Sequence, residues 1–166
     1  MNKQIIKYLK LLPLYVLLQV IVLNEVLFFA YINPFLYVIP IISLPLKTPK
    51  WFLLIYAFLL GFSIDLFSGS LGFHSTATIL IAFVKPFISK ITIPHNILGD
   101  TDEITLKKVG NKAFIIFSLF LILIHNSCLF LTEHLSVNLA LFGKIMASSL
   151  VTLIIILIAQ LFQQNK

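Results

Sequence analysis

Arginine is absent from this 166-residue chain, and all 12 of its basic residues are lysines. Arginine carries the planar fork that grips phosphate and carboxylate groups through paired bonds, so its absence argues against a dedicated phosphate-binding enzyme. Charge of either sign is also scarce. Only 11% of the residues are charged and 60% are hydrophobic, whereas soluble domains carry about 25% charged residues. No soluble fold of this size could bury so much apolar surface.

Other functional signatures are equally sparse. The single cysteine, Cys128, excludes an intrachain disulfide, and its place inside an apolar run favours a small packing residue. The lysines lie in short groups between apolar runs, so the net charge of +6 does not form the basic stripe of a nucleic-acid-binding protein. The chain has no glycine-rich nucleotide loop and no His-Glu-x-x-His motif. These absences favour a non-enzymatic protein without a cofactor or a metal.

Apolar runs of about 20 residues, the length of a membrane-spanning helix, recur along the chain. They predict an all-α membrane protein with six transmembrane helices in one integral membrane domain, 1–166. The first span should remain as an uncleaved anchor, because no small-x-small cleavage site follows it. The predicted spans are 11–29, 34–46, 51–67, 71–91, 113–131 and 139–162.

The second predicted span is short. A helix over 34–46 would rise only about 20 Å, against a hydrocarbon core of about 30 Å, and Pro34, Pro40 and Pro45 interrupt it. It could be kinked, extended at its N-terminal side, or partly re-entrant.

The lysines predict the orientation, because lysines near the ends of membrane helices favour the cytoplasmic side. Six spans with both termini inside leave only Lys144 toward the outside, whereas omitting the second span would misplace the middle lysines. We therefore expect a multi-pass membrane protein with both termini and the 92–112 loop in the cytoplasm. The lysines on the cytoplasmic side would be Lys3, Lys7, Lys10, Lys47, Lys50, Lys85, Lys90, Lys107, Lys108, Lys112 and Lys166.

Two further groups of residues have ordinary interpretations. The acidic and histidine residues of the 92–112 loop match no metal-ligand spacing, so a solvated loop is favoured over a metal site. The aromatic residues near the span ends are typical of interfacial belts. The loop group is His95, Asp100, Asp102 and Glu103, and the aromatic group is Tyr8, Tyr31, Tyr37 and Trp51.

Polar residues inside lipid are energetically expensive and need a partner, a cavity or a function. In the predicted topology seven of them fall in the outer, periplasmic half of the membrane, and the inner half is comparatively plain. Any active surface should therefore face the periplasm. These residues are Asn24, Glu25, Asp65, His74, His125, Asn126 and Glu133.

The densest polar segment is 61–74. Gly61 and Asp65 share a helix face, so the missing side chain would let a second helix approach beside the carboxylate. Asp65 could pin the hairpin by accepting from the Ser68-Gly69-Ser70 turn or meeting His74, or it could contact a partner or ligand. Either hydroxyl of the turn could also cap the next helix.

His125 has two catalytic interpretations that we disfavour. Glu133 lies about 12 Å farther along the helix, too far for a direct hydrogen bond, so a bond from His125 to a neighbouring helix is preferred. A Ser63–His125 dyad faintly resembles an intramembrane serine protease, but Ile64 stands where that family carries glycine.

One family accounts for these features together. The pattern Gly61-x-x-x-Asp65-Leu66-x-Ser68-Gly69-Ser70-Leu71-Gly72-x-His74 resembles the signature of the rod shape-determining MreD family, in which a glycine and an aspartate end one helix and Leu-Gly opens the next. Lys85 stands where arginine is more usual. The form of this family in Bacteroidetes resembles the segments 31–37, 44–46, 49–51 and 82–87, together with His125, Phe130 and Glu133.

The resemblance implies a non-catalytic scaffold of the cell-elongation complex, supporting cell shape and lateral peptidoglycan synthesis. The implied partners are an MreC-like periplasmic scaffold protein and, indirectly, an MreB-like actin, a SEDS glycan polymerase and a class B penicillin-binding protein. The implied location is the bacterial inner membrane, in contact with lipid, and no nucleic acid is expected as a partner. The implied fold is similar to the substrate-binding subunits of energy-coupling-factor transporters. A small-molecule-binding transporter subunit is the alternative, because Asp65, His74, Asn24 and Glu25 could line a pocket open to the outside.

Overall fold

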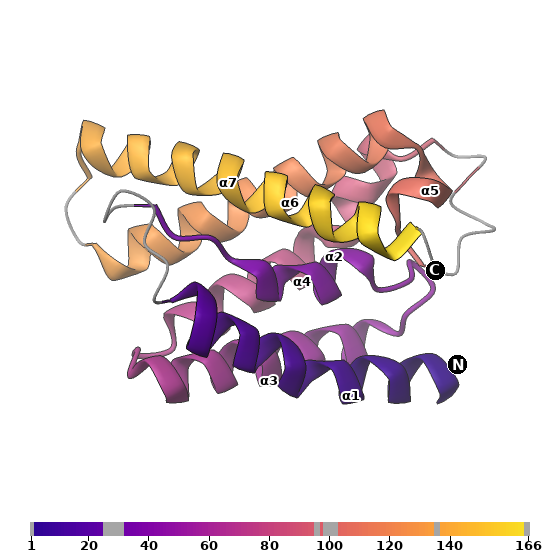
Figure 1. Ribbon diagram of the computed structural model, residues 1–166, viewed down its shortest axis with the longest axis horizontal. Coiled ribbons are helices and arrows are strands. Elements are labelled where there is room, and N and C mark those ends of the chain that lie inside the picture. Colours follow the sequence, from indigo (N-terminus) through magenta and orange to yellow (C-terminus); the bar gives the residue numbers. More distant parts are fainter. Residues whose placement is uncertain (1, 25–31, 95–96, 98–102, 135–136, 165–166) are drawn as a thin grey trace.

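Helices make up most of the computed structural model, which describes residues 2–24, 32–94, 97, 103–134 and 137–164 (Figure 1). These residues contain no β-strand. The short helices are the π-helical turn η1 (Leu18–Leu23), the 3-10 turn η2 (Leu36–Val38), α2 (Ile39–Ser43) and α5 (Leu106–Val109). The long helices are α1 (Asn2–Leu17), which η1 continues, α3 (Lys50–Ser68), α4 (Phe73–Thr92), α6 (Asn111–Glu133) and α7 (Leu139–Gln164).

Five helical stretches in the described part of the chain are long and apolar enough to cross a membrane. The chain is therefore an all-α, multi-pass membrane protein. Four of the stretches coincide within a few residues with predicted spans. The five stretches are Ile5–Leu23, Lys50–Ser68, Phe73–Thr92, Asn111–Glu133 and Leu139–Phe162.

The first span begins earlier than predicted. Its helix starts at Asn2 and the apolar stretch at Ile5, not at Leu11. Lysine is a good helix former, so Lys7 and Lys10 lie inside the helix, where their long stems can reach toward water. The predicted end of this span, 25–29, lies outside the described residues.

The second predicted span is not a membrane-length helix. It contains only η2 and α2, joined to its neighbours by non-helical backbone. Leu44 leaves the helical conformation with a ψ of 137°, as expected for a residue that precedes a proline. The segment is nevertheless completely buried at Tyr37, Val38 and Ile41, which are 0% exposed.

This short segment runs along α7 through the middle of the bundle. The backbone N–H of Phe35 donates to Thr152 Oγ1 at 3.1 Å, and Asn33 N–H donates to Ser148 Oγ at 3.2 Å. Farther along, Gln160 Nε2 donates to Ser43 Oγ at 3.4 Å. Because 12 residues of α7 rise about 18 Å, residues 33–43 follow this helix over more than half the thickness of a bilayer core.

A buried lysine caps the C-terminal end of α2. Lys85, on α4, is only 1% exposed. Its ammonium donates to the carbonyl oxygen of Ile41 at 2.7 Å and to that of Leu44 at 2.5 Å, which satisfies carbonyls that the short helix leaves unpaired. Lys85 therefore has a structural role, and its inclusion among the lysines that indicate the cytoplasmic side is not justified, because a count of lysines cannot detect burial.

The long helices pack side by side, with α4 between α3 and α6, α7 on α6, and α1 on α3. Both chain ends lie at the same end of this bundle, and the turn between α3 and α4 lies at the other (Figure 1). We call these the terminal end and the hairpin end. At the terminal end, Lys7 pairs with Glu103 of the 92–112 loop at 2.7 Å.

Candidate functional site

Asp65 ties together the turn between α3 and α4. The carboxylate is 3% exposed and accepts hydrogen bonds from Ser70 Oγ at 2.5 Å and from the backbone N–H groups of His74 at 3.1 Å and Ser75 at 2.9 Å. The hydroxyl of Ser75 is a fourth donor. Four donors match the four lone-pair positions of an ionised carboxylate.

The carboxylate takes the place of a missing helix cap. Gly72 is the N-cap residue of α4 and has no side chain to offer. Asp65, reaching over from α3, accepts from the second and third N–H groups of α4 instead, as an N-cap side chain would. The predicted capping by a turn hydroxyl is therefore wrong, because Ser70 donates to Asp65 and Ser68 Oγ accepts from Asn24 Nδ2 at 3.0 Å.

Glycines make this turn possible. A Cβ on Gly61 would lie 2.6 Å from the Cα of Ser75 and 2.7 Å from the carbonyl oxygen of His74, so the two helices approach beside the carboxylate as the spacing predicts. Gly69 and Gly72 have φ values of +65° and +88°, a region that side chains disfavour.

A second polar group joins α1 and η1 to the short central segment. Gln19, which is 1% exposed, accepts from Leu36 N–H at 2.9 Å and donates to the carbonyl oxygen of Pro34 at 2.9 Å. It also donates to Asn24 Oδ1 at 3.0 Å. These bonds satisfy the irregular backbone around Pro34, which is necessary inside lipid.

A chain of side chains crosses the bundle from α4 to α7. Tyr37 Oη lies 2.7 Å from His74 Nδ1 and 2.8 Å from His125 Nε2. His125 Nδ1 lies 2.9 Å from Asn126 Oδ1, and Asn126 Nδ2 donates to Ser149 Oγ at 2.9 Å. We call these five residues the cross-bundle chain.

The hydrogen bonds of Ser149, the last residue of the cross-bundle chain, determine where the protons in the cross-bundle chain lie. Ser149 gives its only hydroxyl proton to the carbonyl oxygen of Ile145 at 2.7 Å, so it must accept from the amide of Asn126. The amide oxygen then faces His125 Nδ1, which has to carry a proton. With one proton on the ring, His125 Nε2 accepts from Tyr37.

His74, the first residue of the cross-bundle chain, lines a pocket. Tyr37, having donated to His125, accepts from His74 Nδ1–H, and His74 also lines a pocket of about 190 Å³ at the hairpin end. We call it the hairpin pocket. Its polar lining consists of Asn24, Asn33, Ser68, Ser70, His74 and Glu133.

The geometry leaves the family open. No family model, curated protein or solved structure matches the chain. The assignment of a function therefore depends on the residues themselves.

The structure places the predicted site residues in two connected groups. Gly61, Asp65, Ser68, Gly72 and His74 belong to the α3–α4 hairpin. Asn24 and Glu133 join Ser68 and His74 around the hairpin pocket. His125 belongs to the buried chain and bonds to another element, as preferred, and not to Glu133. Glu25 lies outside the described residues.

Several central residues were missed. Tyr37 was assigned to an interfacial belt but is 0% exposed, because the segment around it enters the core. Gln19 could have been found by the rule that identified Asn24, since it is an amide inside an apolar span. Ser75 and Ser149 give no signal in the sequence beyond their small size.

Other candidate chemistry is not brought together. Ser63 Oγ donates to the carbonyl oxygen of Leu59 at 2.7 Å and His125 bonds to Tyr37, so the two do not form a dyad. No group of three metal-binding side chains occurs among the described residues. His95, Asp100 and Asp102 of the loop lie outside them.

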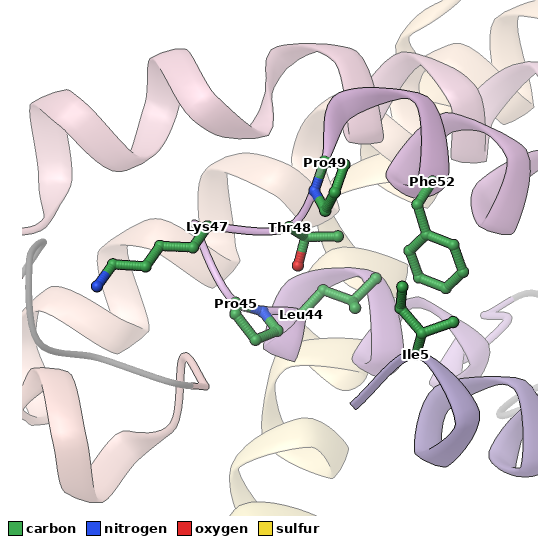
Figure 2. A pocket seen from close by; sticks show the side chains of 7 residues that line it. All are labelled: Ile5, Leu44, Pro45, Lys47, Thr48, Pro49 and Phe52. Atoms are coloured by element: carbon green, nitrogen blue, oxygen red, sulfur yellow. The ribbon is translucent and has the colours of Figure 1, made fainter. Parts of the chain in front are cut away.

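The terminal end holds a different pocket. It has a volume of about 230 Å³ and is mostly apolar, formed by Ile5, Leu44 and Phe52 with the Pro45–Pro49 turn (Figure 2). Its one charged residue, Lys47, extends away from the apolar side chains. With no converging polar groups, this pocket is a weaker candidate than the hairpin pocket.

Proposed function

We propose that the protein is a non-enzymatic membrane scaffold subunit of a cell-elongation complex, similar to the MreD family. The observation that carries the proposal is the unit built from residues 61–75. The pattern Gly61 to His74 that carries the resemblance builds the α3–α4 hairpin: Gly61 permits the close approach of the two helices, Asp65 caps α4, and Gly72 is an N-cap residue without a capping side chain. A pattern that builds a rigid turn suits a scaffold.

The distribution of polar bonds supports the same proposal. Buried groups that could do chemistry are used to hold helices together, as in the cross-bundle chain. Among buried side-chain polar atoms of the described residues, only Ser118 Oγ lacks a partner. Polar groups that face outward gather at the hairpin pocket, where the exposed carboxylate of Glu133 is available to a partner.

The proposed orientation places the hairpin pocket on the periplasmic side of the inner membrane, with both termini in the cytoplasm. The central segment 32–49 then counts as a sixth crossing, since it leads from the hairpin end to the start of α3 at the terminal end (Figure 1). In this orientation a membrane-proximal segment of an MreC-like protein docks at the hairpin pocket. MreB-like actin, the SEDS polymerase and the class B penicillin-binding protein assemble indirectly.

A small-molecule-binding subunit of a transporter is the competing function. The hairpin pocket does contain converging polar groups, but its volume of about 190 Å³ is below the roughly 300–1,000 Å³ of ordinary ligand sites. Asp65, a residue that would have to bind such a ligand, is saturated by the turn. The pocket suits a few side chains of a partner better than a whole ligand.

Photocrosslinking in native membranes tests the proposal. A crosslinking amino acid replaces Phe73, which lines the hairpin pocket, and in a matched strain Trp51, which is 61% exposed at the terminal end. Mass spectrometry identifies the products. We expect an MreC-like protein from position 73 and not from position 51. Recovery of an ATPase module with the tagged chain, and no cell-wall protein, would establish the transporter function instead.

A further inference from the structure

A groove between α3 and α4 is apolar along most of its length and basic at one end. It has a volume of about 330 Å³ and is walled by Leu53 and Leu54 on α3 and by Phe83 and Phe87 on α4. Phe83 and Phe87 are 62% and 61% exposed, so the groove opens sideways from the bundle. In a membrane protein, this direction faces the acyl chains.

The basic end of the groove carries two lysines. Lys50 is the first residue of α3 and Lys90 lies in the last turn of α4, and both line the groove. Because the two helices are antiparallel, both ammonium groups lie at the terminal end. Neither lysine has an acidic partner in the part of the chain that the structure describes.

Neighbouring residues set the depth of this basic end and the shape of the groove. Trp51 is 61% exposed next to Lys50, and exposed tryptophans in membrane proteins mark the headgroup level.

Pro86 lacks the N–H that would bond to the carbonyl of Ala82, and both residues line the groove. The small side chain at Ala82 gives the groove its floor. The third lysine of the region, Lys85, is buried and held by carbonyls, so it does not contribute.

We propose that this groove binds an anionic phospholipid. The phosphate lies between Lys50 and Lys90, and an acyl chain lies along Phe83 and Phe87. The groove residues on α4, from 82 to 90, span about 12 Å along the helix. This length is short for a docked helix but matches the part of one acyl chain nearest the headgroup. Anionic lipids are abundant in the cytoplasmic leaflet, where the lysine bias places the terminal end.

Lipid titration of the purified full-length chain in neutral detergent, followed by native mass spectrometry, tests this site. Phosphatidylglycerol, phosphatidylcholine of the same chain length and inorganic phosphate are compared. We expect phosphatidylglycerol to bind at least tenfold more tightly than phosphatidylcholine. The double variant Lys50→Gln/Lys90→Gln should lose roughly thirtyfold in affinity for phosphatidylglycerol, given the attraction of each lysine to anionic headgroups. The exposed pair Lys107→Gln/Lys108→Gln removes the same charge outside the groove and should stay within twofold of wild type.

A groove-filling variant separates a lipid site from a simple anion site. Leu54→Trp should weaken binding of both lipids, because the indole occupies the space of the acyl chain. Equal affinities for the two lipids, or equal losses in the two lysine pairs, would overturn the proposal. So would full competition by inorganic phosphate with no effect of Leu54→Trp, which would identify a free-anion site. Crosslinking of Phe87 to a protein with no bound lipid would assign the groove to a partner helix.

Discussion

At the scale of single residues, Asp65 shows how a charged group can be stable inside a membrane protein. A carboxylate in lipid is costly unless all of its acceptor positions are used. Here every donor comes from the α3–α4 hairpin: two hydroxyls, from Ser70 and Ser75, and the N–H groups of His74 and Ser75. The geometry therefore favours hairpin pinning over partner contact for this residue.

Asp65→Asn should destabilise the protein even though its shape is conserved. An amide has one acceptor oxygen, so its NH₂ group would face N–H or O–H donors that now lack a partner, at a cost of about 1–3 kcal/mol. Asp65→Leu should cost more, because all four donors are left unpaired. Thermal unfolding in detergent and abundance in membranes measure both effects.

Ser63→Ala serves as the control for this series. It lies on the same helix and loses only a bond to the carbonyl of Leu59, so it should remain close to wild type. An Asp65→Asn protein as stable as the Ser63→Ala protein would show that the carboxylate does not cap α4. Normal abundance of both Asp65 variants with reduced recovery of an MreC-like partner would assign Asp65 to partner contact.

At the scale of elements, two interactions stabilise unusual parts of the bundle: one at the end of the short helix α2, and one at the close contact between α3 and α4. The ammonium of Lys85 closes α2, whose carbonyls would otherwise be unpaired next to the Pro45 turn. Gly61 lets α3 and α4 approach until a Cβ would touch backbone atoms of Ser75 and His74. Backbone cannot move aside as a flexible side chain can, so this contact tolerates no larger residue.

Gly61→Ala should separate α3 from α4 and cost about 1–3 kcal/mol, the usual penalty for overpacking. Gly143→Ala is the matched control, because Gly143 also lies inside a long helix but a Cβ there would meet nothing within 4 Å. Its helix should gain about 0.5–1 kcal/mol from the removal of glycine. Opposite shifts in the thermal midpoints of the two variants are expected. Equal shifts would show that the close contact at Gly61 does not contribute.

At the scale of the whole molecule, the two ends of the bundle carry different side chains, and the proposed orientation depends on that difference. The Lys7–Glu103 pair and most of the exposed lysines lie at the terminal end, while polar side chains gather at the hairpin end. Lys144, the exception in the predicted topology, lies 4.5 Å from the centre of the Phe130 ring. That contact gives its charge a local partner.

Cysteine labelling tests this orientation in a Cys128→Ser background. Leu71→Cys reports the hairpin end, where the native side chain is 88% exposed, and Lys107→Cys reports the terminal end. With a membrane-impermeant maleimide, we expect labelling of position 71 in intact spheroplasts and of position 107 only after permeabilisation. The reverse pattern would show that the proposed orientation is wrong and that the hairpin pocket faces the cytoplasm.

Local patterns in the sequence are enough to predict several features of this protein. Apolar runs locate four long helices because a helix in lipid satisfies its own backbone. The Gly61 and Asp65 spacing predicts a close helix approach because residues four apart share a helix face. The concentration of polar residues toward one end likewise follows from their positions within the spans, before any packing is known.

Which partners the polar residues bind depends on how the helices pack. The central segment 32–49, which contains only the short helices η2 and α2, is stable because Gln19, Lys85 and α7 supply hydrogen bonds to it from positions far away in the sequence. For the same reason Tyr37 lies in the core, where it links His74 to His125. A hydrogen bond across a bundle depends on the relative rotation and depth of packed helices, and no local pattern in the sequence encodes these quantities.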